Sequence, residues 1–387
     1  MRALFRATIA TPLSLGWYEP GVLDERFYIR PASVKGVWRW WARAFVGGVL
    51  YERGCLKGRR GRDVFLAPTR EEAEAVMRHV GKTLGLGYAG EEGAQASQFR
   101  LRVRVLRRPE KGVARRREGL VRVAGRQAAL QRFKLLTLNN DVEYAVGGEF
   151  EIEVEAEVDR RVFNASVGVL AVALTLSGLG KGSRKALGDL DVVEARGVQL
   201  PNSLPKLVEE VRAAVAELIR DRCPGRPQGL PPMPVVTAEK WSGAELAAVY
   251  EAGLGFEDLH NFFLRPARAK ALTGNYAARD PLREKLAAWV LGLPREQRGT
   301  GYTSPLERRA STIIAAYHGQ RHLVGGGRGY LTVLISGDWP TEIEWSGAGS
   351  ERIRIDEAKI LDAYKTAVEE FAAYAQRLRS NVTKIWP

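Results

Sequence analysis

The alternation of apolar and polar residues predicts the strands of the first half of the chain. Residues 2–10 alternate over a short stretch. In residues 99–106, "FRLRVRVL", apolar positions alternate with arginine, and in residues 149–158, "EFEIEVEAEV", they alternate with glutamate. Strict period two with one apolar face is typical of a sheet that is covered on one side only. We therefore expect the arginine row and the glutamate row to be neighbours that pair across the sheet.

A helix with two different faces is predicted in "RPASVKGVWRWWARAF", residues 30–45. Ser33, just after Pro31, is the expected N-cap. At about 100° per residue the apolar side chains share one arc: Val34, Val37, Trp38, Trp41, Ala44 and Phe45. The opposite arc carries Lys35, Arg39 and Arg43, and Trp40 lies at the boundary. This basic stripe is either a solvated face or a track for phosphates.

The remaining patterns predict an α+β protein. Residues 162–178 are apolar nearly all round, which favours a buried helix; a glycine-rich loop at 178–188 and a strand at 190–195 follow. The order strand, helix, strand, strand, helix, strand is the ferredoxin-like (RRM-like) plan. An arginine-rich insertion, residues 107–148, interrupts it, and the glycine-rich residues 85–97 are expected to be mobile.

A proline-rich linker, "CPGRPQGLPPMP" at 223–234, marks the expected domain boundary. We expect an N-terminal domain at 1–199, a helix and linker at 200–234, and a C-terminal domain at 235–387, so that two ferredoxin-like domains stand in tandem. The second half is expected to hold these elements: helices at 242–253, 256–272, 281–291 and 356–379, and strands at 311–318 and 329–336.

Composition changes the picture chiefly through charge. The chain of 387 residues has a formal net charge of +14 and a pI of about 9.9. This favours a polyanionic partner, either nucleic acid or an anionic membrane surface; the alternative is the charge-rich surface of a thermophilic protein. No apolar run approaches the roughly 18 residues that span a bilayer, and the N-terminal stretch does not have the pattern of a signal peptide. Cys55 and Cys223 suggest neither a metal site nor a disulfide framework, so we expect a cytoplasmic protein without metal or cofactor.

Basic residues outside the helix gather in three segments. The glycine-rich loop "GLGKGSRKALG" carries Lys181, Arg184 and Lys185, although a plain turn is the simpler interpretation. The loop at residues 51–63, "YERGCLKGRRGRD", is basic and punctuated by glycine. The insertion is expected to be an arm that binds a nucleic-acid backbone rather than bases, through Arg107, Arg108, Arg115, Arg116, Arg117, Arg122 and Arg126.

The glycine-rich loop resembles the signature of the RAMP superfamily, the ferredoxin-like RNA-binding subunits of CRISPR effectors. Gly178, Leu179, Gly180 and Gly188 match that signature, whereas Ala186 stands where the family has a glycine. "RPASVKGVWRWWAR" resembles a segment of one branch, the first RAMP subunit of the type III-B (Cmr) complexes. "LGLP" at 291–294 and "ERRAST" at 307–312 resemble the second domain of that branch.

The resemblance implies a non-catalytic subunit of an antiviral ribonucleoprotein. Its implied partners are the guide (CRISPR) RNA near its 3′ end, the complementary target RNA and other RAMP subunits, without a membrane. Carried over by position, the implied RNA-binding residues are Arg30, Ser33, Lys35, Arg39, Trp40, Arg43, Lys181, Arg184, Lys185, Arg308 and Arg309, and the insertion adds Arg115, Arg116 and Arg117.

Two other functions stay open at this point. A metal-dependent RAMP endoribonuclease would use Asp24 in "GVLDERF", although a solvent-exposed loop acid is the simpler interpretation. Histidine acid–base catalysis is disfavoured, because none of the histidines falls in either loop and His318 with His322 is expected at the surface of a hairpin turn. A protein of the membrane surface would bind liposomes even in excess RNA.

Overall fold

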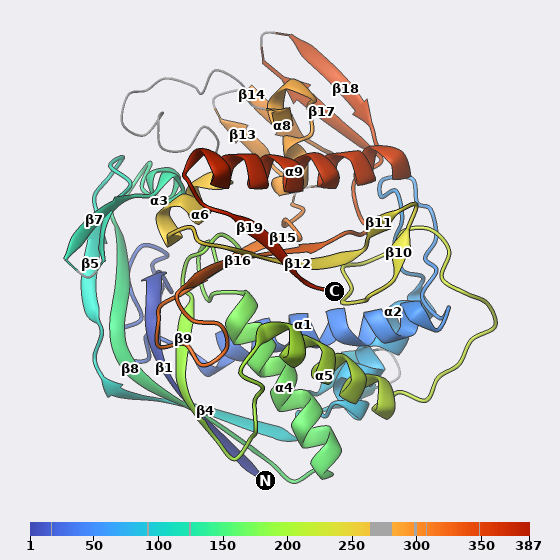
Figure 1. Ribbon diagram of the computed structural model, residues 1–387, viewed down its shortest axis with the longest axis horizontal. Coiled ribbons are helices and arrows are strands. Elements are labelled where there is room, and N and C mark those ends of the chain that lie inside the picture. The colour runs from blue at the N-terminus through green and yellow to red at the C-terminus, as the bar shows by residue number, and fades with distance from the viewer. Residues whose placement is uncertain are drawn as a thin grey trace.

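The first half of the chain is built on an antiparallel sheet backed by helices, as seen in a computed structural model (Figure 1). The structure describes residues 1–16, 18–90, 93–123, 125–263, 281–297, 300–306, 308–347 and 349–387. The elements that make this unit are β1 (Arg2–Leu13), α1 (Pro31–Glu52), β4 (Phe99–Arg107), β8 (Val142–Ala156), α4 (Arg160–Leu176) and β9 (Leu190–Arg196). The strands lie in the order β4-β8-β1-β9, with β5 (Glu110–Ala114) also paired to β8.

The predicted pairing of the arginine and glutamate rows is confirmed. Arg102 lies opposite Glu153 in the register of β4 and β8, and its guanidinium is 3.7 Å from the carboxylate of Glu155. Arg104 forms ion pairs with Glu151 at 3.3 Å and with Glu153 at 3.2 Å. The apolar positions of the same strands face the helices and are buried or half-buried. The outer face of this sheet is therefore a ladder of opposite charges that largely neutralise one another.

The second half repeats the same strand order with different lengths. Its elements are β12 (Ala247–Ala252), α6 (Phe256–Phe262), β15 (Ile313–His318), β16 (Arg328–Leu334), α9 (Glu357–Arg377) and β19 (Val382–Trp386), and its sheet runs β15-β16-β12-β19. The strands expected at 311–318 and 329–336 and the terminal helix are confirmed. Part of the helix expected at 256–272 lies outside the described residues. Only α8 (Pro281–Glu284) and a 3₁₀ turn, η2 (Ala288–Leu291), occupy 281–291.

The helix expected at 242–253 is wrong, because this segment is the central strand β12. Its alanine and glutamate content favours a helix, but β12 pairs with β16 on one side and β19 on the other. Those partners lie about 80 and 130 residues farther along the chain, and strand formation depends on such neighbours more than on intrinsic propensity. The C-terminal strand β19 was not expected for the same reason.

Shorter elements decorate these two sheets. They are α2 (Arg70–Arg78), a π-helical turn η1 (His79–Thr83), β2 (Tyr88–Gly90), β3 (Gly93–Gln95), β6 (Leu120–Val123), β7 (Arg126–Ala129), α3 (Gln131–Leu136), α5 (Leu204–Leu218), β10 (Lys240–Trp241), β11 (Ala244–Glu245), β13 (Arg295–Gln297), β14 (Thr300–Thr303), β17 (Glu342–Ser346) and β18 (Ser350–Arg354). The segment expected to be mobile thus holds the β2–β3 hairpin. The insertion folds around its own apolar cluster, in which Phe133 packs edge-on against Tyr144, so it is more than an extended arm.

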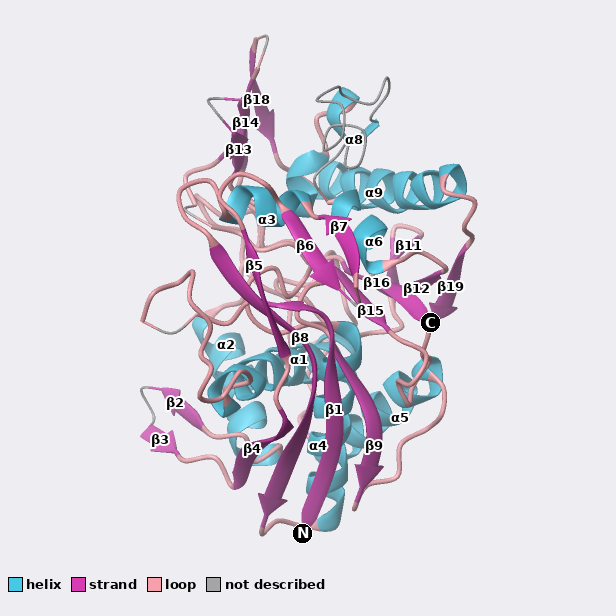
Figure 2. Ribbon diagram, turned by 90° about the vertical axis from the view of Figure 1, so that its left-hand side faces the viewer, coloured by secondary structure: helices cyan, strands magenta, loops and turns pink. Residues whose placement is uncertain are grey.

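The two halves pack as layers around a continuous core. In Figure 1, α9 lies above the second sheet, and α1, α4 and α5 lie below it; Figure 2 shows the strands β1, β8 and β9 in front of those helices. Trp38 and Trp41 of the first half belong to the same buried cluster as Trp289 and Trp339 of the second. Because α4 contacts β9 as well as β15 and β16, the relative position of the halves is fixed by packing.

A disulfide corrects the expectation from the cysteine count. Cys55, just after α1, is bonded to Cys223 with an S–S distance of 2.13 Å, across 168 residues of sequence. The bond fastens the start of the proline-rich segment 223–234 to the end of α1. Two cysteines so far apart in sequence gave no pattern from which this pairing could be recognised.

Candidate nucleic-acid interface

Helix α1 divides into the two faces that its sequence predicts. Val34, Trp38, Trp41, Ala44 and Phe45 are buried, and Val37 is half-buried. The indole N–H of Trp38 donates to the carbonyl of Ser166 (2.7 Å), and that of Trp41 donates to the Ser177 hydroxyl (3.0 Å). The predicted cap is wrong: the helix begins at Pro31, with Arg30 at the N-cap and no side-chain cap. Proline at the first helical position needs no partner for an N–H, which explains the earlier start.

The basic stripe of α1 is only partly free. The Lys35 ammonium donates to the carbonyl of Phe99 (3.2 Å), and the Arg39 guanidinium donates to the carbonyl of Gly87 (2.6 Å). Burial, followed by the positive charge of Arg39, lowers the pKa of Lys35. Arg43 is exposed. The first two cations therefore help to attach α1 to neighbouring segments, and Arg43 is the member of the stripe most open to solvent.

The glycines of loop 178–188 permit close backbone approaches. A Cβ at Gly178 would lie 2.0 Å from the carbonyl oxygen of Leu187, and one at Gly188 would lie 2.0 Å from that of Leu179. Gly180 and Gly188 also have positive φ, and so does Ala186, at +52°. Ala186 thus adopts the left-handed conformation at the position where the resemblance has glycine, at some cost in strain.

Arg184 joins this loop to α1 and to the second half of the molecule. Its guanidinium lies over the ring of Trp40, 4.5 Å from the ring centroid, and it donates to the carbonyl of Ser311 (2.7 Å). Trp40 in turn packs edge-on against Trp41. Burial, with the nearby positive charge of Arg309 and Arg308, lowers the pKa of Arg184 to about 10, so the side chain is still charged at neutral pH.

The two other cations of the loop have different surroundings. Lys181 donates to the carbonyl of Pro20, and burial lowers its pKa. The ammonium of Lys185 lies 5.5 Å from the ring centroid of Phe263, and the Lys185 carbonyl accepts from Nδ1 of His260 (2.8 Å). Both side chains are half-buried. The loop therefore presents its cations in several directions from one rigid turn.

Arg308 and Arg309 differ sharply in exposure. Arg308 is exposed, whereas Arg309 is buried, with its guanidinium over the ring of Trp339 at 4.3 Å. Arg309 also donates to the carboxylate of Asp338 (2.7 Å) and to the Ser336 hydroxyl (3.3 Å). Arg309 is placed as a structural anchor, and Arg308 remains available at the surface.

The insertion arginines contact groups within the insertion or directly beside it. Arg115 pairs with Asp141 at 3.0 Å, and the backbone N–H of Arg116 donates to the same carboxylate (2.7 Å). Arg117 is exposed and has a φ of +64°. Arg107 pairs with Glu149 at 3.4 Å, at the end of the charge ladder. Arg107 and Arg115 are thus neutralised locally.

Asp24 is not the exposed loop acid of the simpler interpretation. It is buried, with 2% of its surface exposed, and its carboxylate lies 3.8 Å from the guanidinium of Arg30. Arg30 is held in this ion pair at the start of α1. The loop folds back on itself, since the Asp24 N–H donates to the carbonyl of Leu15 (3.1 Å), and this turns the carboxylate inward.

A buried histidine cluster between the halves was not predicted. His318 and His322 are buried rather than at the surface, and their rings stack with centroids 3.8 Å apart. Nδ1 of His318 lies 3.1 Å from the Asp191 carboxylate, and Nε2 faces the carbonyl of Thr175 (2.7 Å). The Val192 N–H donates to Nδ1 of His322 (2.9 Å), which keeps this ring neutral. Burial, with the charge of His318, lowers the pKa of His322 well below its usual value.

This cluster is better suited to an ion pair than to a metal. Asp191, His318 and His322 offer ligand atoms within 4.8 Å of one another. The rings are nearly parallel, at 16°, so the in-plane lone pairs of the two imidazoles do not converge on one point. Sequence spacing gave no sign of the cluster, because Asp191 comes from β9 and the histidines come from β15 and the turn after it.

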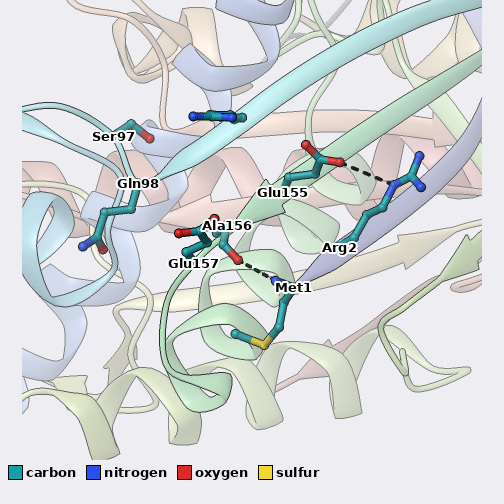
Figure 3. A pocket seen from close by; sticks show the side chains of 8 residues that line it. Met1, Arg2, Ser97, Gln98, Glu155, Ala156 and Glu157 are labelled. Carbon is teal, nitrogen blue, oxygen red and sulfur yellow. Dashed lines mark hydrogen bonds and ion pairs between the residues drawn. The ribbon is translucent and has the colours of Figure 1, made fainter.

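A separate cavity opens at the end of the first sheet where the chain begins (Figure 3). It has a volume of about 620 Å³ and is lined by Met1, Arg2, Ser97, Gln98, Arg100, Glu155, Ala156 and Glu157. The N-terminal ammonium donates to the carbonyl of Ala156 (2.6 Å), and Arg2 is 3.7 Å from Glu155. The mixture of acidic and basic side chains distinguishes this cavity from the cationic junction around Arg184, Arg308 and Arg309.

Comparison with known proteins identifies the first half. The profile of the RAMP superfamily matches residues 6–189, a range that includes most of β1, and all of α1, the insertion and the glycine-rich loop. This part of the chain belongs to the RAMP superfamily. No curated protein matches the sequence. Among the described residues, no helix is both long enough and apolar enough to cross a membrane.

Solved structures align with the chain at low sequence identity. The crystal structure of apo Cmr1 from Pyrococcus furiosus aligns with a TM-score of 0.46 and 15% identity, over 100% of this chain and 99% of that one. A chain in the cryo-EM structure of the type III-B Cmr-beta complex bound to cognate target RNA aligns with a TM-score of 0.49 and 13% identity, over 95% and 99%.

Proposed function

We propose that the chain is a non-catalytic RNA-binding subunit of a type III-B CRISPR effector, acting in the cytoplasm. The observation that carries the proposal is the meeting of the RAMP loop with α1, where Arg184 stacks on Trp40. Arg43 and Arg308 are both exposed. Arg43 follows Trp40 by three residues in α1, and the charge of Arg308 acts on Arg184. A cluster of guanidinium groups next to a half-buried aromatic ring suits an RNA backbone and an unpaired base.

The finer parts of the proposal rest on the RAMP membership and the strand order. Both sheets follow one sequence of strands, which supports two tandem ferredoxin-like domains at 1–199 and 235–387, joined by 200–234. The proposed partners are guide RNA near its 3′ end, target RNA and neighbouring RAMP subunits. The burial of Asp24 beside Arg30 favours a binding role over a metal-dependent nuclease, and Asp24→Ala is expected to leave target cleavage by the assembled complex unchanged.

Salt-dependent binding of single-stranded RNA tests the proposal. In the full chain, Arg43→Gln with Arg308→Gln is expected to lower the slope of log affinity against log salt by about 1.4, because each phosphate contact on a single strand contributes about 0.7. Arg160→Gln with Arg196→Gln removes the same charge from exposed positions at the far end of α4 and β9. Equal slopes for both variants and the wild type would contradict the proposal.

A further inference from the structure

The hairpin at residues 57–67 carries a dense basic surface that the glycine-rich loop and α1 do not account for. Its sequence, "KGRRGRDVFLA", holds four basic residues and one acid. Lys57, Arg59, Arg60 and Arg62 are all exposed. A turn from Gly61 to Val64 forms its tip, where the Gly61 N–H donates to the Val64 carbonyl (3.0 Å).

The hairpin is a fixed part of the fold. Arg59 and Ala67 exchange backbone hydrogen bonds of 2.7 and 3.0 Å across it. On its outer side the Phe65 N–H donates to the carbonyl of Trp339 (2.7 Å), and the Thr341 N–H donates to the carbonyl of Asp63 (3.0 Å). Its arginines are therefore held at defined positions against the second half, so they lose little backbone entropy when they bind a ligand.

Its guanidinium groups differ from those of the sheet in one decisive respect. Arg102 and Arg104 form ion pairs with the glutamate row. Among the described residues, Arg59, Arg60 and Arg62 have no carboxylate within ion-pair distance; Arg60 instead lies over the ring of Phe65, at 5.2 Å. The charge of Arg59 also acts on Glu71 of α2. Guanidinium groups that lack an ion-pair partner and stand close together in the sequence favour a polyanion that neutralises them.

The hairpin adjoins the cationic junction, the region around Arg184, Arg308 and Arg309. Trp339, which accepts its backbone hydrogen bond, also lies under the guanidinium of Arg309, and the charges of Arg309 and Arg308 act on Arg184. We propose that the 57–67 hairpin is a second phosphate-binding surface, which continues the path of a bound RNA strand from Arg184 past Arg308. This inference rests on the proposed RNA-binding function and extends the surface that serves it.

Fluorescence anisotropy with a labelled single-stranded RNA of mixed sequence tests the inference in the full chain. The variant Arg59→Gln, Arg60→Gln, Arg62→Gln is expected to lose about tenfold or more in affinity at moderate salt and to lower the salt slope by about 2, or about 0.7 per lost phosphate contact. The matched control is Arg160→Gln, Arg161→Gln, Arg196→Gln, whose exposed arginines lie elsewhere. It removes the same net charge and is expected to keep the wild-type slope.

The outcomes separate this inference from the proposed function. If the wild type binds RNA and the hairpin variant keeps the same salt slope, the inference alone is overturned. The hairpin would then be assigned to an acidic protein surface as its partner class. An equal loss in the control would also overturn it, because the effect would then be one of net charge. Absence of salt-dependent binding by the wild type would overturn the proposed function itself. Thermal melting of each variant confirms that it is folded.

Discussion

Trp40 shows what a helical wheel can and cannot determine at the scale of single residues. The period of α1 placed Trp38 and Trp41 in the core, and both are buried. It left Trp40 between the faces, and its partner Arg184 comes from 144 residues farther along the chain. The carbonyls that receive Lys35 and Arg39 belong to Phe99 and Gly87. Such partners are set by the tertiary fold. The basic stripe could therefore be recognised from the sequence, but which of its side chains are exposed to solvent could not.

The histidine cluster gives a pH-dependence that can be measured at the level of one residue. The unfolded chain binds a proton at His322 below about pH 6.5, whereas the folded protein resists it because the pKa is lowered. The unfolding free energy of the wild type is therefore expected to fall as pH drops below that value, by up to about 1.4 kcal/mol per pH unit. His322→Asn, which keeps an acceptor for the Val192 N–H, should lose this contribution.

Asp189 is expected to give a pH-dependence of the unfolding free energy with the opposite sign to that of His322. Burial raises its pKa to about 7, so its contribution to stability is present below its unfolded pKa of about 4 and is lost as pH rises through 7. Asp189→Asn is expected to flatten that loss. Urea denaturation of the three proteins between about pH 5 and pH 8 measures both effects. A His322→Asn variant with the pH-dependence of the wild type would show that the ring does not resist protonation.

Elements were predicted well where they carried their own periodicity. The arginine and glutamate strands were recognisable because alternation reports the buried face directly, and the terminal helix α9 kept its amphipathic pattern over many turns. The segment 242–253 failed because its residues favour a helix in isolation, while β16 and β19 supply pairing that only the folded chain contains. That error and the unexpected strand β19 together hid the order of elements in the second half.

The disulfide leads to a prediction about the segment that joins the halves. Cys223→Ser releases the chain after α5 from the end of α1. It is expected to lower the unfolding free energy by about 2–5 kcal/mol, because a long loop in the unfolded chain is no longer closed. Thermal melting with and without a reductant measures this: the reductant should lower the Tm of the wild type and leave that of the variant unchanged. A wild-type Tm that does not respond would contradict a stabilising bond.

At the scale of the whole molecule, net charge suggested a polyanionic partner but was a poor guide to the surface that would bind one. The net positive charge of +14 is not spread evenly over the surface. The arginine row that is most conspicuous in the sequence is paired with glutamates in the charge ladder of β4 and β8. Two exposed cations stand apart from this ladder: Arg43 on α1, and Arg308, whose charge acts on Arg184 of the RAMP loop. The fold brings together three regions that lie far apart in sequence, and only the RAMP motifs signalled that they belong to one surface.

Photo-crosslinking to a single-stranded RNA that contains 4-thiouridine, with the crosslinked peptides identified by mass spectrometry, tests the central claim most directly. The account predicts that crosslinks concentrate on the peptide of Trp40 and Arg43 and on loop 178–188. It also predicts few on the outer face of the first sheet, where Arg102 and Arg104 are paired. Crosslinks on residues 99–107 and 149–157 in place of the α1–loop junction would contradict it.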